Sequence, residues 1–179
     1  MGATLGLWQL GGFVFTAILG TLLHFLFDWS GKKAAVGLFS AVNESIWEHM
    51  KLLYYPMALF ALLQYWFWSG EVEQFWCVKL AGLIFGLALI PVLYYTYTGA
   101  LGLERAWFNI AIFFVAAAAV YWLECRLFAL TPAWLLPPAL CAGLIIMIGA
   151  SFMLLTFVPP RWPLFADPVT GSYGFQRKN

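Results

Sequence analysis

Residues 138–158 read PALCAGLIIMIGASFMLLTFV, a stretch without a single charged side chain. A helix of ~20 mainly apolar residues is long enough to cross the hydrocarbon core of a bilayer. Similar runs precede it, and the predicted spans are residues 7–28, 45–68, 75–97, 106–123 and 138–158. These runs are continuous, whereas a β-barrel shows short alternating strands. The sequence therefore predicts an all-α integral membrane protein, a five-helix transmembrane bundle.

The composition of the chain supports this class. Of the 179 residues, 64% are hydrophobic and 9% are charged, against about 25% charged in an ordinary soluble domain. So few charges exclude a soluble fold of this size and a disordered chain. The net charge of +1 gives no basic surface for nucleic acid, so membrane lipid is the expected partner.

The basic residues indicate an orientation. With five spans, the side that carries the C-terminus holds Lys32, Lys33, Lys51, Arg105, Arg161, Arg177 and Lys178. The opposite side holds only Lys79 and Arg126, together with the acidic residues Glu71, Glu73 and Glu124. The positive-inside rule then predicts that the N-terminus is outside and the C-terminus cytosolic. We expect residues 1–158 to form one membrane domain and residues 159–179 a cytosolic tail packed on the membrane face.

The three cysteines are too few for a disulfide framework. Cys77 and Cys125 both fall near the predicted outer ends of spans, where the two residues are able to pair. Free buried thiols are the favoured interpretation, and Cys141 is expected in the core.

The first predicted span carries small and polar residues at a spacing of four. Gly12, Thr16 and Gly20 are typical of close helix packing, and His24 and Asp28 continue the spacing. A carboxylate four residues from an imidazole can fix its tautomer and leave the other nitrogen as a base or metal ligand. The competing interpretation is a satisfied polar packing contact.

The segment that leads into the second span is the richest in polar groups, and residues 41–51 read AVNESIWEHMK. Ser45 and Glu48 fit a capping box, with Ser45 as the N-cap. That pattern does not account for Asn43, Glu44 or His49. The connection from the first span is short, so these residues are expected near His24 and Asp28.

Two imidazoles and several carboxylates are suitable ligands for Zn²⁺, Fe²⁺ or Mn²⁺. The sequence predicts His24, His49 and Asp28 as ligands of a divalent transition metal, and Glu48 and Glu44 as catalytic bases. The spacing differs from H-E-x-x-H, because the two histidines lie on different helices. A structural hydrogen-bond network and a proton or solute site remain open alternatives.

Further polar residues are predicted on the same side of the membrane. Candidate ligand-binding residues are Asn43, Lys51, Tyr94, Arg105, Asp167 and Tyr173. The tail contains turn sequences at Asp167-Pro168 and Gly171. We expect an ordered loop, either a lid over the cluster or a membrane-skimming anchor through Trp162, Phe165 and Tyr173.

Residues 42–51 resemble the V-N-E-S-x-W-E-H-x-K signature of an uncharacterised family of small bacterial multipass membrane proteins. The tail, with Pro159-Pro160, Leu164-Phe165, Asp167-Pro168 and Thr170-Gly171-x-Tyr173-Gly174, is similar to the C-terminal pattern of that family. The resemblance spans essentially the whole chain and implies a location in the bacterial cytoplasmic (inner) membrane. It implies no activity, but it favours a cytosolic site assembled from both segments.

Three functions follow as hypotheses. The first is a metal- or ligand-binding membrane protein, working as an interfacial metal-dependent hydrolase or transferase. The second is a small solute or ion transporter that acts as a homodimer. The third is a non-catalytic membrane assembly subunit, in which the polar cluster only stiffens the bundle.

Overall fold

The computed structural model describes residues 2–68, 74–102, 105–130 and 136–176. Its elements are α1 (Gly2–Trp29), α2 (Ala34–Gly37), α3 (Ile46–Trp68), α4 (Phe75–Leu101), α5 (Ala106–Leu130), α6 (Pro138–Phe157) and the 3₁₀ helix η1 (Pro163–Phe165). Within the described ranges, the β pairing is limited to one isolated antiparallel bridge between Ala166 and Tyr173. The predicted all-helical class is confirmed.

In the part of the chain that the structure describes, four helices are long and apolar enough to cross a membrane, namely Thr4–Trp29 in α1, Phe75–Leu101, Trp107–Leu130 in α5, and Pro138–Phe157. The chain therefore has a helical fold that is compatible with a membrane. The long helix α3 is not among these four, and it carries the buried polar residues Glu48, Lys51 and Gln64. The five long helices overlap the five predicted runs, but α1 begins at Gly2 instead of residue 7, α4 ends at Leu101 instead of residue 97, and α5 ends at Leu130 instead of residue 123.

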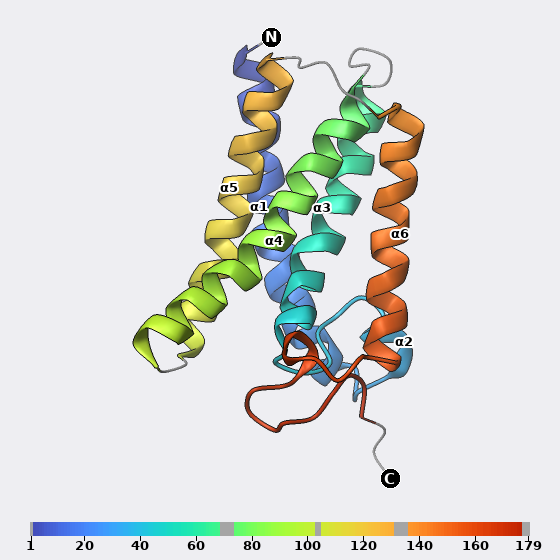
Figure 1. The fold of residues 1–179 in the computed structure, drawn as a ribbon. Helices are drawn as coiled ribbons and strands as arrows, with labels where there is room; N and C mark the ends of the chain where they lie inside the picture. Colours follow the sequence, from blue (N-terminus) through green and yellow to red (C-terminus); the bar gives the residue numbers. More distant parts are fainter. Residues whose placement is uncertain (1, 69–73, 103–104, 131–135, 177–179) are drawn as a thin grey trace.

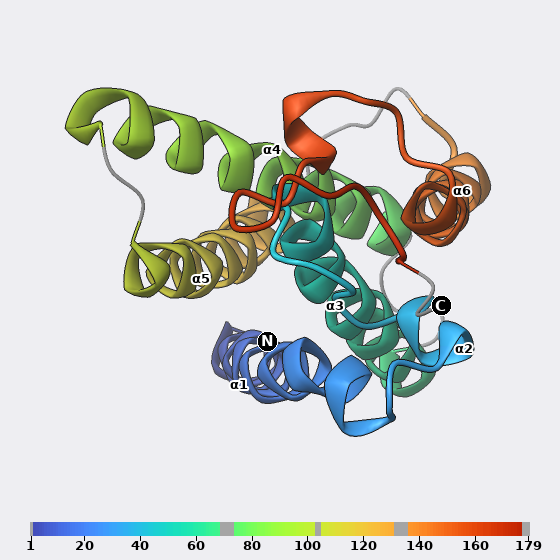
Figure 2. The same ribbon diagram turned by 90° about the horizontal axis from the view of Figure 1, so that it is seen from below.

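Helix α3 lies at the centre of the bundle. It contacts α1, α4, α5 and α6, and Figure 1 shows α1 and α5 on one side of it and α6 on the other. Viewed along the bundle in Figure 2, the α4–α5 hairpin extends away from α3. We call the end where α3 begins and residues 158–176 pack the tail end, and the end where α4 and α6 begin the opposite end.

The small residues of α1 allow the close packing that their spacing predicted. A Cβ atom at Gly12 would collide with the rings of Tyr121 and Phe60. One turn further, the hydroxyl groups of Thr16 and Tyr121 are hydrogen-bonded at 2.7 Å. This stripe therefore fixes how α1 packs against α3 and α5, and it has a structural role.

The opposite end of the bundle is covalently linked. Cys77 at the start of α4 forms a disulfide with Cys141 at the start of α6, with a Cα–Cα distance of 5.1 Å. The expectation of a free thiol is wrong for Cys77, whereas Cys125 is free as expected. Cys141 is buried, as expected. The sequence did not reveal the pair, because it does not specify that the starts of α4 and α6 are lateral neighbours.

The same half of the bundle contains a buried ion pair. Lys79 Nζ lies 2.6 Å from Glu124 Oε2, and both side chains are at most 5% exposed. The ammonium group also lies 5.5–5.7 Å from the ring centroids of Phe75, Tyr121 and Phe128. The prediction that Glu124 belongs to an outer loop is wrong, since its burial and pairing keep it within α5. Glu71 and Glu73 lie outside the described residues.

Candidate metal centre

The turn that leads into α3 is held by its own side chains. Ser45 is the N-cap, and its Oγ accepts a hydrogen bond from Glu48 N at 3.4 Å. Asn43 Oδ1 accepts one from Ser45 N at 3.0 Å, and Asn43 Nδ2 donates to Gly174 O in the tail at 3.3 Å. The capping box is incomplete, because the Glu48 carboxylate accepts instead from Val42 N at 3.0 Å. Glu44 thus has a fixed backbone and a half-exposed side chain.

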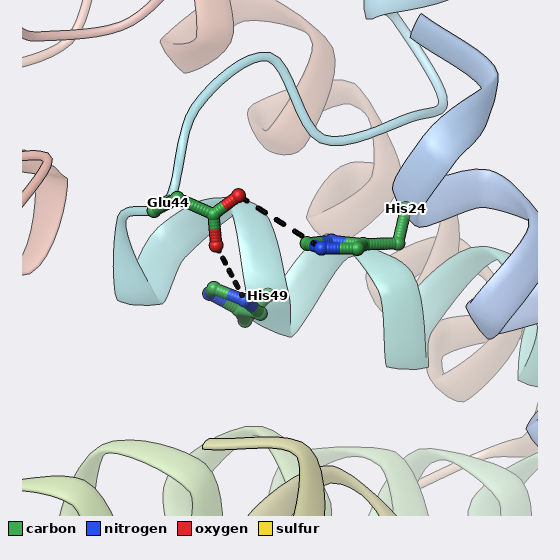
Figure 3. Close-up of side chains that lie close together, drawn as sticks. All are labelled: His24, Glu44 and His49. Atoms are coloured by element: carbon green, nitrogen blue, oxygen red, sulfur yellow. Dashed lines mark ion pairs between the residues drawn. The ribbon is translucent and has the colours of Figure 1, made fainter. Parts of the chain in front are cut away.

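Three of the predicted residues come together at the tail end. His24 lies near the end of α1, Glu44 just before α3 and His49 in the first turn of α3, and Figure 3 shows the carboxylate reaching both imidazoles. His24 Nε2 lies 3.8 Å from Glu44 Oε1, and His49 Nε2 lies 3.5 Å from Glu44 Oε2. The two rings are stacked with centroids 5.6 Å apart. The histidine and glutamate side chains therefore form one cluster.

The hydrogen bonding of His49 determines which of its nitrogens carries hydrogen. His49 Nδ1 lies 2.9 Å from Ser45 O, and a carbonyl oxygen can only accept, so Nδ1 is the donor. In a neutral imidazole this leaves a lone pair on Nε2, which faces the Glu44 carboxylate. Two electron-rich atoms in this position repel each other unless a proton or a metal cation lies between them. The backbone contact is also the usual outer support of a metal-binding histidine.

The spacing of the cluster suits a transition metal. One ligand atom from each of His24, Glu44 and His49 lies within 4.8 Å of the other two. Zn²⁺ holds nitrogen and oxygen ligands at ~2.0–2.2 Å in a tetrahedron, so two ligands of one ion lie about 3.4 Å apart. The three side chains would therefore draw closer together when they bind one ion. Three protein ligands leave a position for water or substrate, as in catalytic zinc sites.

His24 is the less supported of the two imidazoles. Its Nδ1 is buried and has no hydrogen-bond partner among the described residues. Its side chain is 28% exposed, against 19% for His49. The orientation of the His24 ring therefore depends on α1 packing and on Glu44.

A pocket adjoins the cluster on the side of the α4–α5 hairpin. Its polar lining residues are Glu44, His49, Tyr94 and Asn109, and its apolar lining residues are Ile46, Ile90 and Ile112. The Tyr97 hydroxyl donates to Asn109 Oδ1 at 2.6 Å, which joins α4 to α5 beside the pocket. The pocket brings apolar side chains of three helices next to two residues of the cluster.

Glu48 and Lys51 lie in a separate buried network. Lys51 Nζ is 2.6 Å from Glu48 Oε2, and both side chains are at most 1% exposed. The ammonium group also donates to Gly37 O and to Thr156 Oγ1, each at 2.8 Å. Thr156 Oγ1 donates to Glu48 Oε1 at 3.0 Å. Both carboxylate oxygens of Glu48, the predicted base, are thus engaged by protein groups.

The two tail residues singled out in the sequence support the tail itself. Asp167 is buried, and its carboxylate accepts hydrogen bonds from Val169 N at 2.8 Å and from the Thr170 hydroxyl at 2.8 Å. Tyr173 forms the bridge with Ala166. The tail contacts α3 through Phe165, whose ring lies 4.6 Å from that of Trp47.

The other predicted residues lie apart from the three-residue cluster. Asp28 is exposed and pairs with Lys32 at 3.7 Å, one turn along. Arg105 is exposed just before α5. Tyr94 lines the pocket. Trp162 is 65% exposed, whereas Phe165 is buried.

Sequence reasoning missed Thr156 and Gln64. Thr156 is fully buried and joins α6 to the Glu48–Lys51 pair. The sequence signal for Thr156 is that it is a polar residue in a mainly apolar run, near the same end of its helix as Lys51. Gln64 is also fully buried, and neither atom of its amide has a hydrogen-bond partner among the described residues.

Comparison with known proteins places the chain in a family. No curated protein and no solved structure matches it. A model of a family of unknown function, DUF6512, matches residues 3–175. This match covers nearly the whole chain, including the motif before α3 and the folded tail. The chain therefore belongs to the family DUF6512.

Proposed function

We propose that this protein is a five-span protein of the bacterial cytoplasmic membrane that binds a divalent transition metal through His24, Glu44 and His49. The observation that carries the proposal is the Glu44 carboxylate, which lies within 3.8 Å of both Nε2 atoms while His49 Nδ1 donates to Ser45 O. This arrangement calls for a positive charge among the three groups. Zn²⁺, Fe²⁺ and Mn²⁺ all suit such ligands.

The chemistry that suits this centre is metal-dependent hydrolysis or group transfer at the membrane interface. A bound metal lowers the pKa of a coordinated water toward ~7 or polarises a substrate carbonyl or phosphoryl group. Glu44 is assigned as a metal ligand, and its second carboxylate oxygen is our candidate for the base that would accept a proton from such a water. The buried Glu48 carboxylate accepts Val42 N–H in the segment that carries Glu44, so we assign Glu48 a positioning role.

The metal site is tested by elemental analysis of detergent-purified protein. We expect about one transition metal per chain in the wild type, and its loss in His24→Ala, His49→Ala and Glu44→Ala. Asp28→Asn is the matched control, because Asp28 lies on the same helix as His24 but is exposed and paired with Lys32. A folded wild type that binds no added Zn²⁺, Fe²⁺ or Mn²⁺ would overturn the proposal and leave a proton-sharing cluster.

The proposed orientation places the tail end in the cytosol. The positive-inside rule favours it, and the burial of Lys79 in an ion pair removes one basic residue from the exposed surface of the opposite end. The Cys77–Cys141 disulfide at the opposite end is an independent argument, since disulfides persist in oxidising compartments. In this arrangement, helix α3 also crosses the membrane, which brings the number of spans to five. Its polar groups are directed into the bundle.

Single-cysteine labelling tests the orientation. In a Cys125→Ser chain we introduce Leu130→Cys at the opposite end or Val169→Cys in the tail, at positions that are 72% and 78% exposed. A membrane-impermeant maleimide is expected to label the Leu130→Cys variant in intact spheroplasts and the Val169→Cys variant only after permeabilisation. The reverse pattern would contradict the proposed orientation.

A further inference from the structure

A second group of polar side chains lies in the half of the bundle away from the candidate metal centre. We call it the polar layer. It has one member from each of four helices, and each member is at most 4% exposed: Gln9 in α1, Gln64 in α3, Lys79 in α4 and Glu124 in α5. Polar and charged residues inside a membrane domain are costly and are usually retained for a function. The proposed metal site makes no use of these four residues.

The packing on the tail-end side of the polar layer brings three of its helices together. A Cβ atom at Gly12 of α1 would collide with the rings of Phe60 of α3 and Tyr121 of α5, so these three residues are direct neighbours. Residues three or four positions apart share one face of a helix. The residues one turn further toward the opposite end, on the same three faces, are Gln9, Gln64 and Glu124.

The packing on the other side of the polar layer joins all four helices. The residues four positions beyond its members, toward the opposite end, belong to one hydrophobic cluster: Leu5, Trp68, Phe75 and Phe128. The three aromatic rings of this cluster have centroids 5.6–6.5 Å apart. Because the levels on both sides are packed together, the four polar side chains meet in the interior of the bundle.

The members of the polar layer leave several hydrogen-bonding atoms without a partner. Lys79 Nζ pairs with Glu124 Oε2 at 2.6 Å, but Glu124 Oε1 has no hydrogen-bond partner among the described residues. The same is true of the amide oxygen and the amide nitrogen of both Gln9 and Gln64. Burying such groups without partners is unfavourable, and native proteins satisfy nearly all of them, either internally or with water.

We infer that the polar layer binds internal water, which bridges Gln9, Gln64 and Glu124. The Lys79 ammonium group disfavours a metal cation in this place, and the Glu124 carboxylate disfavours an anion. A small neutral ligand that both donates and accepts hydrogen bonds satisfies amides and carboxylate alike. Buried water typically makes about three hydrogen bonds, and polar groups that meet without direct contact are its usual partners. The bundle then has a hydrated centre that is independent of the metal site.

Water-edited solid-state NMR of ¹⁵N-glutamine-labelled protein in proteoliposomes tests this inference. The chain has four glutamines, and the exposed Gln176 gives the reference signal. We expect magnetisation transfer from water to the side-chain amides of Gln9 and Gln64, although both are buried. Gln64→Leu should lower the transfer to Gln9 at least about 2-fold, because a bridging water then loses one of its roughly three partners.

The matched control is Gln74→Leu, which makes the same change just before α4 and outside the polar layer. It should leave the transfer to Gln9 unchanged. Absence of transfer to both Gln9 and Gln64, with a normal signal at Gln176, would overturn the inference and indicate that the amides pair within the protein. Transfer to Gln9 that Gln64→Leu does not alter would overturn the bridge. If Gln64→Leu perturbs the backbone spectrum, the reciprocal variant Gln9→Leu, observed at the Gln64 amide, replaces it.

Discussion

Replacing Lys79 with methionine is expected to destabilise the folded bundle by about 3–5 kcal/mol, because the buried Glu124 carboxylate loses its partner. The two charged atoms lie 2.6 Å apart and both side chains are at most 5% exposed. Reversible unfolding in bicelles measures the free energy. The same loss is expected for Glu124→Leu, which leaves the ammonium group of Lys79 among aromatic rings.

The double variant Lys79→Met/Glu124→Leu distinguishes two explanations for the loss of stability. Either the fold needs the ion pair itself, or the loss comes from leaving one buried charge without its partner. Replacing both partners of a buried ion pair by apolar residues of similar size is often neutral or stabilising, so the double variant should recover most of the lost stability. Asp28→Asn, in the exposed Asp28–Lys32 pair, is the control and should cost well under ~1 kcal/mol. A Lys79→Met variant as stable as that control would contradict the expected energetics.

The helical class was predictable because it depends on composition and run length alone. Each of the five long apolar runs is a helix, and the cap at Ser45 was readable from a four-residue pattern. By contrast, Cys77–Cys141 and Lys79–Glu124 join different helices. Such pairs depend on which helices are lateral neighbours, and apolar packing between membrane helices leaves little trace of that in one sequence.

The proximity of the three cluster residues His24, Glu44 and His49 was predictable from the chain itself. The connection between α1 and α3 is short, which brings His24 near Glu44 and His49. Spacing alone did not predict which of the two glutamates joins the histidines and which is buried, because Glu44 and Glu48 each have polar residues about one helical turn away. The structure separates them by burial, since the Glu44 side chain is 50% exposed and the Glu48 side chain 1%.

Glu48→Gln is expected to lower both the stability of the fold and the affinity of the proposed metal site. The change leaves Lys51 buried without a countercharge, which costs about 3–5 kcal/mol when one partner of a buried pair is removed. It also weakens the acceptor for Val42 N–H, at the start of the segment that orients Glu44. Groups that orient metal ligands typically alter metal affinity by about 10–100-fold, and competition with a chromophoric chelator measures that change.

The double variant Glu48→Gln/Lys51→Met distinguishes a positioning residue from a catalytic base. It removes the uncompensated ammonium charge and retains the amide oxygen of residue 48 as an acceptor for Val42 N–H, while the amide NH₂ group can donate to Thr156 Oγ1, which Lys51 no longer occupies. If Glu48 acts by positioning, this variant should recover stability and most of the metal affinity relative to Glu48→Gln. A single variant Glu48→Gln that keeps wild-type stability and metal content would contradict the positioning role. It would return Glu48 to the role of base, because only a chemical function would then explain a carboxylate held in the interior of the bundle.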